Sequence, residues 1–207
     1  MCSRFEMNAR PSDLARRFGL KAAPPLPNTP ELRPTDQALV IGTWAKDEDG
    51  DGDDGQAPRI LGWGLAVTWA AKPLINARAE TLTRKPTFRP LLDTRCLVPA
   101  TAYFEWRKVG KVKLKNRIAL SEGGVFAFAG LTDGERFTIV TCAPQPAIAH
   151  IHERMPVILD RRAESPWIDP DVSFAEVSGL LVPYGAEPLK AEEETPTGQR
   201  SFPFNGP

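Results

Sequence analysis

The stretch RIALSEGGVFAFAGLTDGERFTIVTC, residues 117–142, decides the fold. Apolar, β-branched and aromatic residues dominate three short segments within it, and such segments favour strands. These segments are residues 117–120, 125–131 and 137–142. Glu122-Gly123-Gly124 and Asp133-Gly134 separate them, and glycine after an acidic residue is typical of a hairpin turn. The stretch therefore predicts an antiparallel meander of three strands.

Strand-like segments also lie outside this stretch. The predicted strands are residues 38–45, 60–69, 96–109 and 156–159. The predicted helices are residues 12–20, 147–152 and 173–181. The 207 residues include 21 prolines, and proline favours turns and extended connections over long helices. The fold class indicated is α+β, dominated by antiparallel strands.

Charge is balanced over the whole chain but uneven along it. The 26 Lys and Arg residues equal the 26 Asp and Glu residues, which excludes a uniformly basic nucleic-acid coat and a strongly acidic protein. The window from Arg78 to Arg117 nevertheless contains eleven basic and three acidic residues, a surplus of eight positive charges. Acidic residues gather instead at residues 46–55 and 192–194. A basic surface for a polyanion is therefore compatible with zero net charge.

The cysteines and the N-terminal sequence indicate the compartment. Three cysteines, Cys2, Cys96 and Cys142, form no close pair in the sequence, so no disulfide framework is expected. Cys96 and Cys142 lie in apolar runs and are predicted core residues. The first residues lack the apolar region of a signal peptide, and no run of ~20 apolar residues predicts a membrane span. We therefore expect a cytoplasmic protein with no membrane partner.

Cys2 directly follows the initiator methionine. Removal of Met1 would give Cys2 an α-amine beside its thiol, with reference pKa values of ~7.7–8.0 for the amine and ~8.5 for the thiol. An aldehyde can condense with such an amine to an imine, and the thiol can then close on the same carbon to form a five-membered thiazolidine. No internal cysteine can do this. The alternative is that Cys2 is an incidental second residue.

Four motifs, the first of which contains Cys2, together resemble a known protein family. They are Met1-Cys2-Ser3-Arg4-Phe5, Trp63-Gly64-Leu65 with Leu74-Ile75-Asn76-Ala77-Arg78-Ala79-Glu80-Thr81, Arg95-Cys96-Leu97-Val98-Pro99 with Phe104-Glu105-Trp106, and His152-Glu153-Arg154-Met155-Pro156. In this order, over residues 1–160, they resemble the SOS response-associated peptidase (SRAP) family of abasic-site processing proteins. Ser3 stands where the family has Gly, Val67 stands where many members have Pro, and the acidic insertion at 46–55 is foreign to the family.

The resemblance implies a fold and a domain layout. It implies a single SRAP-like α+β domain over residues 1–185, with mostly antiparallel strands in curved sheets, a barrel-like core and a few flanking helices. Residues 186–207 are polar, charged and rich in proline, so we expect them to form a flexible tail.

The resemblance also implies a covalent link between Cys2 and the ring-opened sugar of an abasic site in single-stranded DNA. Cys2 would be the nucleophile, and Asn76 would hold the sugar or the Cys2 backbone. Glu105 would transfer protons during imine formation and ring closure, and His152 would assist at the sugar hydroxyl and in reversal. Each residue has a plainer interpretation: Asn76 as a turn cap, Glu105 as a solvent-facing strand residue between two core aromatics, and His152 as a structural histidine.

DNA contact would come from cationic and aromatic side chains, because phosphates need neutralising and unpaired bases need stacking surfaces. The candidates are Arg4, Trp69, Arg78, Arg84, Lys85, Trp106 and Arg154. Core packing is the alternative for the tryptophans. The lysines at 108, 111, 113 and 115 flank a predicted hairpin, where either DNA contact or a solvated turn fits them.

The enzyme class implied is a SRAP-type cysteine peptidase that crosslinks itself to DNA, with AP-lyase-like activity as an additional expectation. One alternative is a hydrolase that uses an N-terminal cysteine on peptide or glutamine amide bonds, including removal of its own Met1. A second is a non-catalytic single-strand binding module. No zinc spacing and no phosphate loop occur in the sequence, so we expect no metal and no cofactor. We expect a monomer that associates with the nucleoid when bound to DNA.

Overall fold

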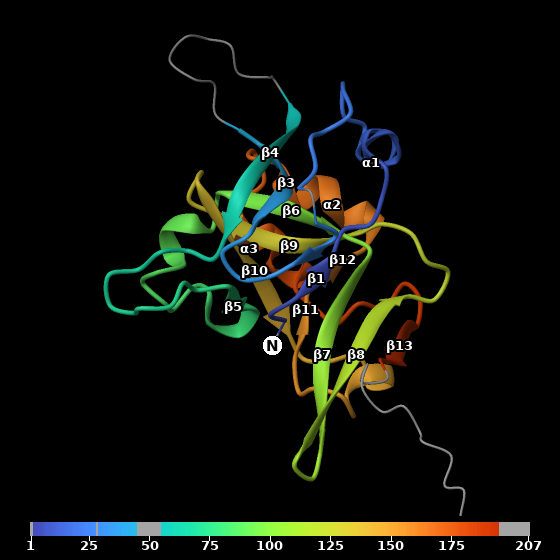
Figure 1. Cartoon of the computed structure of the whole chain (residues 1–207). Helices are drawn as coiled ribbons and strands as arrows, with labels where there is room; N and C mark the ends of the chain where they lie inside the picture. Colours follow the sequence, from blue (N-terminus) through green and yellow to red (C-terminus); the bar gives the residue numbers. More distant parts are fainter. Residues whose placement is uncertain (1, 28, 45–54, 195–207) are drawn as a thin grey trace, which may run out of the picture.

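The strands of the protein form two sheets that share one core (Figure 1). The structure is a computed structural model and describes residues 2–27, 29–44 and 55–194. The acidic insertion expected at 46–55 lies almost wholly outside the described residues.

The larger sheet has eight strands and closes on itself. Its strand order is β11-β10-β4-β3-β6-β9-β12, β5 pairs with β10, and β10 also pairs with β9. The strands are β3 (Gln37–Thr43), β4 (Gln56–Trp63), β5 (Asn76–Arg78), β6 (Arg95–Ala100), β9 (Phe126–Thr132), β10 (Arg136–Cys142), β11 (Met155–Pro156) and β12 (Ile158–Leu159). The β10–β9 pairing joins β10, β4, β3, β6 and β9 into a ring, which confirms the barrel-like core. The pairings β10–β4 and β10–β5 are parallel, and the others are antiparallel.

The smaller sheet has five antiparallel strands in the order β13-β8-β7-β1-β2. They are β1 (Phe5–Glu6), β2 (Glu31–Leu32), β7 (Ala102–Val109), β8 (Val112–Leu120) and β13 (Leu189–Glu193). Because β1 lies between β2 and β7, the N-terminal segment is part of the sheet and places Cys2 beside β7.

The helices are short and lie outside the ring of strands (Figure 1). They are α1 (Pro11–Phe18), α2 (Arg161–Ile168) and α3 (Phe174–Val177), with 3-10 turns η1 (Ala79–Thr81), η2 (Arg89–Leu91), η3 (Pro146–Ile148) and η4 (Ser178–Leu180). Within the described ranges, no helix is long and apolar enough to span a membrane.

Of the three-strand meander predicted for residues 117–142, the second hairpin is confirmed and the first is wrong. β9 and β10 form a hairpin around Asp133-Gly134, as predicted. β8, however, pairs with β7 and β13 in the smaller sheet, so the chain changes sheets between β8 and β9. Gly123 and Gly124 occupy this crossing with φ values of 74° and 94°, a region that favours glycine. The glycine pair therefore makes a crossover rather than a hairpin.

Other predicted segments also differ from the structure, among them the helix predicted at 147–152, of which only the 3-10 turn η3 forms. Residues 96–109 are two strands in different sheets, β6 and β7, which meet at Thr101. The strand predicted at 60–69 ends at Trp63, because Gly64 turns the chain with a φ of 119°. The tail predicted from residue 186 is instead ordered over Leu189–Glu193, where β13 pairs with β8. Residues 195–207 lie outside the described part of the chain.

An aromatic cluster inside the ring holds the N-terminal segment in place. Phe5 packs edge-on against Trp63 at 5.0 Å and against Phe128 at 5.9 Å between ring centroids, and both rings belong to the larger sheet. Phe5 and Trp63 are almost completely buried. Since Phe5 follows Cys2 by three residues, this packing restrains the position of Cys2 relative to the whole core.

A buried ion pair ties α1 to α2. The Arg17 guanidinium contacts both carboxylate oxygens of Glu164, at 2.6 and 2.9 Å. Arg17→Ala would leave this carboxylate buried without its partner, so we expect the free energy of unfolding to fall by about 3 kcal/mol. Urea denaturation at neutral pH measures the effect. Arg16→Ala, which removes a surface partner of Asp13, is the control and should change stability little. Equal effects of the two substitutions would contradict the prediction.

Candidate active site

Cys2 lies three residues before the start of β1 and is completely buried. Its backbone carbonyl accepts a hydrogen bond of 2.7 Å from Nδ2 of Asn76, and its thiol points to the carbonyl of Arg4 at 3.6 Å. The Asn76 contact joins residues 74 positions apart in the chain. Of the two partners expected for Asn76, the sugar and the Cys2 backbone, the structure brings the second to it.

The position of Asn76 follows from the pairing of β5. Asn76 lies opposite Ile139 in the parallel pairing of β5 with β10, and a bridge between Leu65 and Leu74 closes the loop that precedes it. The short strand therefore attaches Asn76 to β10, one of the strands of the ring, and its amide donates to the Cys2 carbonyl.

Glu105 lies on β7, where it is paired with Asn116 of the neighbouring strand β8. The alternation of strand side chains puts Glu105 on the face of Tyr103, and both residues are buried, Glu105 with only 3% of its surface exposed. The interpretation of Glu105 as a solvent-facing residue is therefore wrong. Burial raises the pKa of the Glu105 carboxyl above its usual range, because desolvation disfavours the charged form.

His152 faces Glu105 from the segment that precedes β11. Its Nε2 atom lies 3.9 Å from Oε2 of Glu105, and its Nδ1 atom accepts a 3.0 Å hydrogen bond from the backbone N–H of Arg154. A nitrogen that accepts a hydrogen bond carries no proton, so the proton of the neutral imidazole lies on Nε2, toward Glu105. His152 is thus arranged to direct its Nε2–H into the site as a hydrogen-bond donor.

The thiol of Cys2 is held in its protonated form. Burial raises its pKa, and the nearby Glu105 carboxylate raises it further. Tyr103 lies close to Cys2 and Glu105. Burial is the main cause that raises the pKa of its hydroxyl, and its proximity to these two acidic groups raises the pKa further. Reaction of this thiol therefore requires a nearby group that accepts its proton.

Arg154 fixes the segment that carries His152. Its guanidinium donates to both carboxylate oxygens of Glu80 at 2.9 and 3.0 Å and to the carbonyl of Thr141 at 2.6 Å. Direct DNA contact by Arg154 stays a prediction, and the structure shows its guanidinium paired with Glu80. These contacts also hold the 152–154 segment against β10 and the η1 turn.

An open pocket of about 750 Å³ leads to these residues from the surface. Its lining comprises Ser3, Glu105, Trp106, Lys108, Lys113, Ile151, His152 and Glu153. The pocket thus connects the residue next to Cys2, the two titratable groups and the β7–β8 hairpin.

The remaining DNA candidates lie in two groups. Arg4 lies over the Trp106 ring at 5.4 Å and pairs with Glu31 at 2.8 Å, beside the pocket. The second group precedes and follows η1 and is exposed; its members are Trp69, Arg78, Arg84 and Lys85. Trp69, at 68% exposure, is the most exposed of the large apolar side chains described, so the core-packing alternative is wrong for it.

Sequence reasoning did not single out Tyr103. Its hydroxyl is buried and has no hydrogen-bond partner among the residues described. The signal available was the spacing of two between Tyr103 and Glu105, which places both on one face of a strand. The same described residues contain no cluster of His, Cys, Asp or Glu suited to a metal ion.

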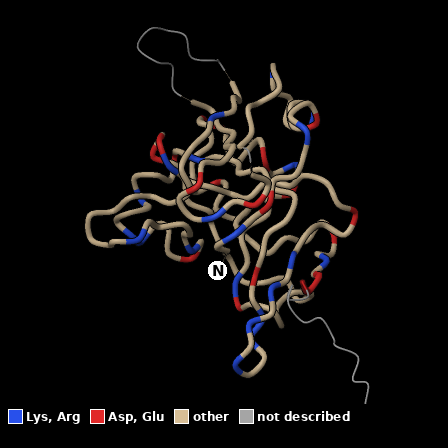
Figure 2. The backbone as a smooth tube through the Cα atoms, viewed as in Figure 1, with Lys and Arg blue, Asp and Glu red and all other residues tan. Residues whose placement is uncertain are grey.

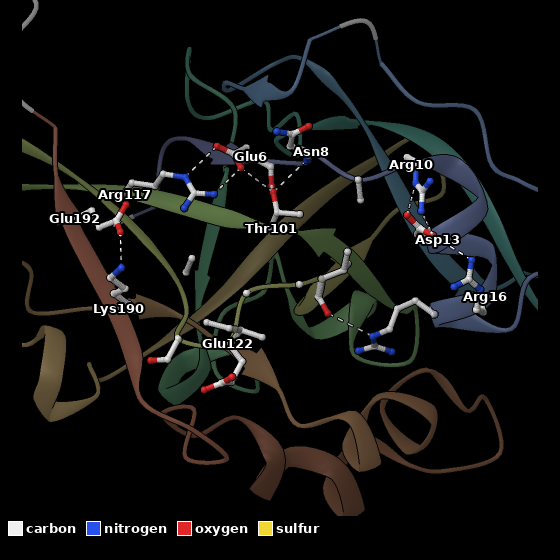
Figure 3. Close-up of a pocket in the computed structure, with 18 residues that line it drawn as sticks. Glu6, Asn8, Arg10, Asp13, Arg16, Thr101, Arg117, Glu122, Lys190 and Glu192 are labelled. Atoms are coloured by element: carbon white, nitrogen blue, oxygen red, sulfur yellow. Dashed lines mark hydrogen bonds and ion pairs between the residues drawn. The ribbon is translucent and has the colours of Figure 1, made fainter.

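A second hollow, of about 810 Å³, lies between α1, β1, β8 and β13 (Figure 3). Its charged side chains largely neutralise one another: Arg10 and Arg16 contact Asp13, Arg117 contacts Glu6, and Lys190 contacts Glu192. Each of these basic groups has an acidic partner, in contrast to the lysines of the first pocket.

Comparison with known proteins agrees with this arrangement. The family model described as SOS response associated peptidase (SRAP) matches residues 1–195. Abasic site processing protein YoqW of Bacillus subtilis (strain 168) is 34% identical over 213 residues, covering 92% of this chain and 91% of its own. Abasic site processing protein YoaM of the same strain is 39% identical over 158 residues, covering 67% of this chain and 70% of its own.

Solved structures agree as well. The crystal structure of a protein from Bacteroides thetaiotaomicron superposes with a TM-score of 0.77 at 26% identity, covering 94% of this chain and 93% of its own. The match of the family model reaches from the first residue through β13, and so includes every element that contributes to the site. With its motifs, its closed sheet and this match over nearly the whole length, the chain belongs to the SOS response associated peptidase (SRAP) family.

Proposed function

We propose that this protein processes abasic sites in DNA by linking Cys2 covalently to the aldehyde of the ring-opened sugar. The observation that carries the proposal is the meeting of Asn76, Glu105 and His152, from three distant parts of the chain, around the second residue. Relatives that match most of the chain are named abasic site processing proteins, which supports the same reaction. The proposed substrate is single-stranded, because a strand without a partner can present the open sugar to a recessed pocket. One chain supplies all four residues, so the proposed unit is a monomer acting at the nucleoid.

The first chemical step uses the α-amine that Cys2 gains when Met1 is removed. The neutral amine adds to the aldehyde carbon, so that a C–N bond forms, the carbonyl π electrons move to oxygen, and one proton passes from nitrogen to that oxygen. Loss of the resulting hydroxyl as water requires proton donation to it and gives the protonated imine. The carboxyl form of Glu105, whose pKa is raised by burial, is suited to this donation, and the Nε2–H of His152 assists with a hydrogen bond.

The second step closes the ring. The sulfur of Cys2 attacks the carbon of the protonated imine, a C–S bond forms, and the π electrons return to nitrogen, which keeps its proton. The thiol proton must leave, since burial keeps the thiol protonated beforehand. Glu105 is the proposed acceptor, and the product is a thiazolidine plus one water from the first step. The same groups, used in reverse, would release the DNA.

The protonated, enclosed thiol favours this reaction over amide hydrolysis. A cysteine peptidase attacks with a thiolate, which environments of positive charge stabilise. In this chain, burial and the Glu105 carboxylate both raise the pKa of Cys2. Addition to an imine is better suited to such a thiol, because the amine of the same residue first holds the electrophilic carbon beside it.

The test is incubation of protein lacking Met1 with an oligonucleotide that carries one abasic site, followed by heating and a denaturing gel. We expect a shifted, heat-stable band that is absent with the matching intact oligonucleotide. Protein that retains Met1 should give no such band, because its Cys2 nitrogen is an amide. Lack of an adduct with the shortened protein would contradict the proposal.

Asn76→Ala is expected to slow adduct formation by about 5- to 150-fold, equivalent to about 1–3 kcal/mol, because the buried Cys2 carbonyl loses its 2.7 Å donor. Single-turnover time courses at saturating protein measure the rate of the chemical step. Asn8→Ala, at an exposed position, is the matched control and should react at the rate of the unmodified protein. An unchanged rate in Asn76→Ala would show that the Cys2 backbone needs no such restraint.

A further inference from the structure

The hairpin of β7 and β8 extends away from the body of the protein (Figure 1). Basic residues gather toward its tip, where Figure 2 shows blue segments with no red between them. The tip pairs Val109 with Val112, and both side chains are about half exposed, at 47% and 55%. The end of the hairpin is therefore a cationic surface with two apolar side chains at its edge.

Three lysines at this tip are exposed and have no acidic partner in the part of the chain that the structure describes. They are Lys108, Lys111 and Lys113, and none of them forms an ion pair with any described residue. Closer to the body the pattern changes: Arg107 pairs with Glu193 at 2.7 Å and Lys115 with Glu194 at 2.8 Å. Glu193 at the end of β13 and the adjacent Glu194 thus neutralise the base of the hairpin and leave its tip positive.

Strand register places two of these lysines face to face. Lys108 lies directly opposite Lys113 in the β7–β8 pairing, and like charges at such positions destabilise a sheet. The β8–β13 pairing follows the opposite rule, with Arg117 opposite Glu192. The Lys108–Lys113 pair therefore does not stabilise the hairpin. A bound anion that contacts both lysines would offset their repulsion.

The basic tip is continuous with the proposed reaction site. Lys108 and Lys113 line the same pocket as Glu105 and His152, together with Trp106. A polyanion with its reactive carbon in this pocket would therefore run along the hairpin.

We propose that the tip of the β7–β8 hairpin binds the phosphodiester backbone of the single DNA strand on one side of the lesion. Lys108, Lys111 and Lys113 contact the phosphates, and the exposed valine pair lies against the sugars or bases. This inference rests on the proposed function, because it concerns the same DNA strand, but it concerns binding before any covalent step. The hollow of Figure 3 has no such role, since its cations are already paired.

The test is the salt dependence of binding to an intact single-stranded oligonucleotide. The variant carries Lys108→Gln, Lys111→Gln and Lys113→Gln, and fluorescence anisotropy is measured over a series of salt concentrations. Each lost phosphate contact lowers the slope of log K against log salt by about 0.7, so a slope smaller by about 2 is expected. The melting temperature should stay the same or rise slightly, because the variant loses the Lys108–Lys113 repulsion.

The matched control carries Arg10→Gln, Arg16→Gln and Lys190→Gln, which remove three exposed positive charges around the second hollow. It should retain the original slope. An unchanged slope in the hairpin variant, or an equal loss in the control, would overturn the inference. Adduct formation with abasic DNA separates the two proposals: the hairpin variant should still reach a complete adduct at saturating protein and low salt. If the unmodified protein forms no adduct, the proposed function fails, whereas the slopes still decide the role of the hairpin.

Discussion

Cys2→Ala is expected to abolish the heat-stable adduct with abasic DNA completely. The variant keeps the α-amine after removal of Met1 and can still form an imine, but it has no sulfur to close the ring, and an imine hydrolyses on heating. No other thiol can substitute, because Cys96 and Cys142 are buried in strands and have no α-amine of their own. The measurement is the fraction of oligonucleotide shifted on a denaturing gel after heating.

Two further variants define the cause of this loss. Cys2→Ser should behave like Cys2→Ala after heating, but reduction with borohydride during the incubation should trap its imine as a stable amine. Cys142→Ala is the matched control and should form the adduct normally. A heat-stable band from Cys2→Ala, obtained without reduction, would show that another nucleophile carries the reaction and would contradict the assignment of Cys2.

Local sequence predicted the strands of this fold better than it predicted their partners. The hairpin at Asp133-Gly134 followed from turn chemistry, and it is confirmed. The crossing at Gly123-Gly124 has an equally strong turn signal, but the β8 and β9 strands on either side belong to different sheets. Partner choice depends on long-range pairing, such as β8 with the late strand β13, and no short pattern in residues 117–142 encodes it.

The residues of the site were predictable from motifs, whereas their surroundings were not. The resemblance selected Asn76, Glu105 and His152, and the structure brings them to Cys2. Strand alternation predicted the face of Glu105 correctly but not its burial, because burial depends on what covers that face. Tyr103 could have been found by the same alternation.

The charge of the basic window was also only partly informative. Its eleven basic residues include Arg95, which is buried and donates to the carbonyls of Trp167 and Asp169 in the α2 region. They also include Arg117, which pairs with Glu6. The acids at 192–194 lie against this window, since β13 pairs with β8, and not away from it as the sequence suggested. A count along the chain cannot separate paired from unpaired basic residues. The window therefore exposes fewer unpaired positive charges than its sequence suggests.

Glu105→Gln is expected to reduce the rate of adduct formation by about 10²- to 10⁴-fold, the usual contribution of a positioned general acid–base group. Glutamine keeps the shape of the side chain but cannot accept the thiol proton during ring closure. Single-turnover rates at saturating protein separate this effect from DNA binding. Glu153→Gln, at an exposed acid of the same pocket, is the matched control and should leave the rate unchanged. Equal rates for Glu105→Gln and the unmodified protein would remove Glu105 from the mechanism.

The same substitution should stabilise the protein at neutral pH. Burial raises the pKa of Glu105 in the folded state above its unfolded value of ~4.3. Below the unfolded pKa the carboxyl is protonated in both states, and its ionisation does not oppose folding. As pH rises toward the folded pKa, the unfolded chain ionises first, so stability falls through this window and stays lower above it. Glu105→Gln removes this loss, and we expect a higher melting temperature at pH 7 but little change at pH 4. A lower melting temperature at pH 7 would show that partners in the fold stabilise the charged carboxylate. Lower stability of the active form at neutral pH is thus the expected consequence of keeping a buried base beside Cys2.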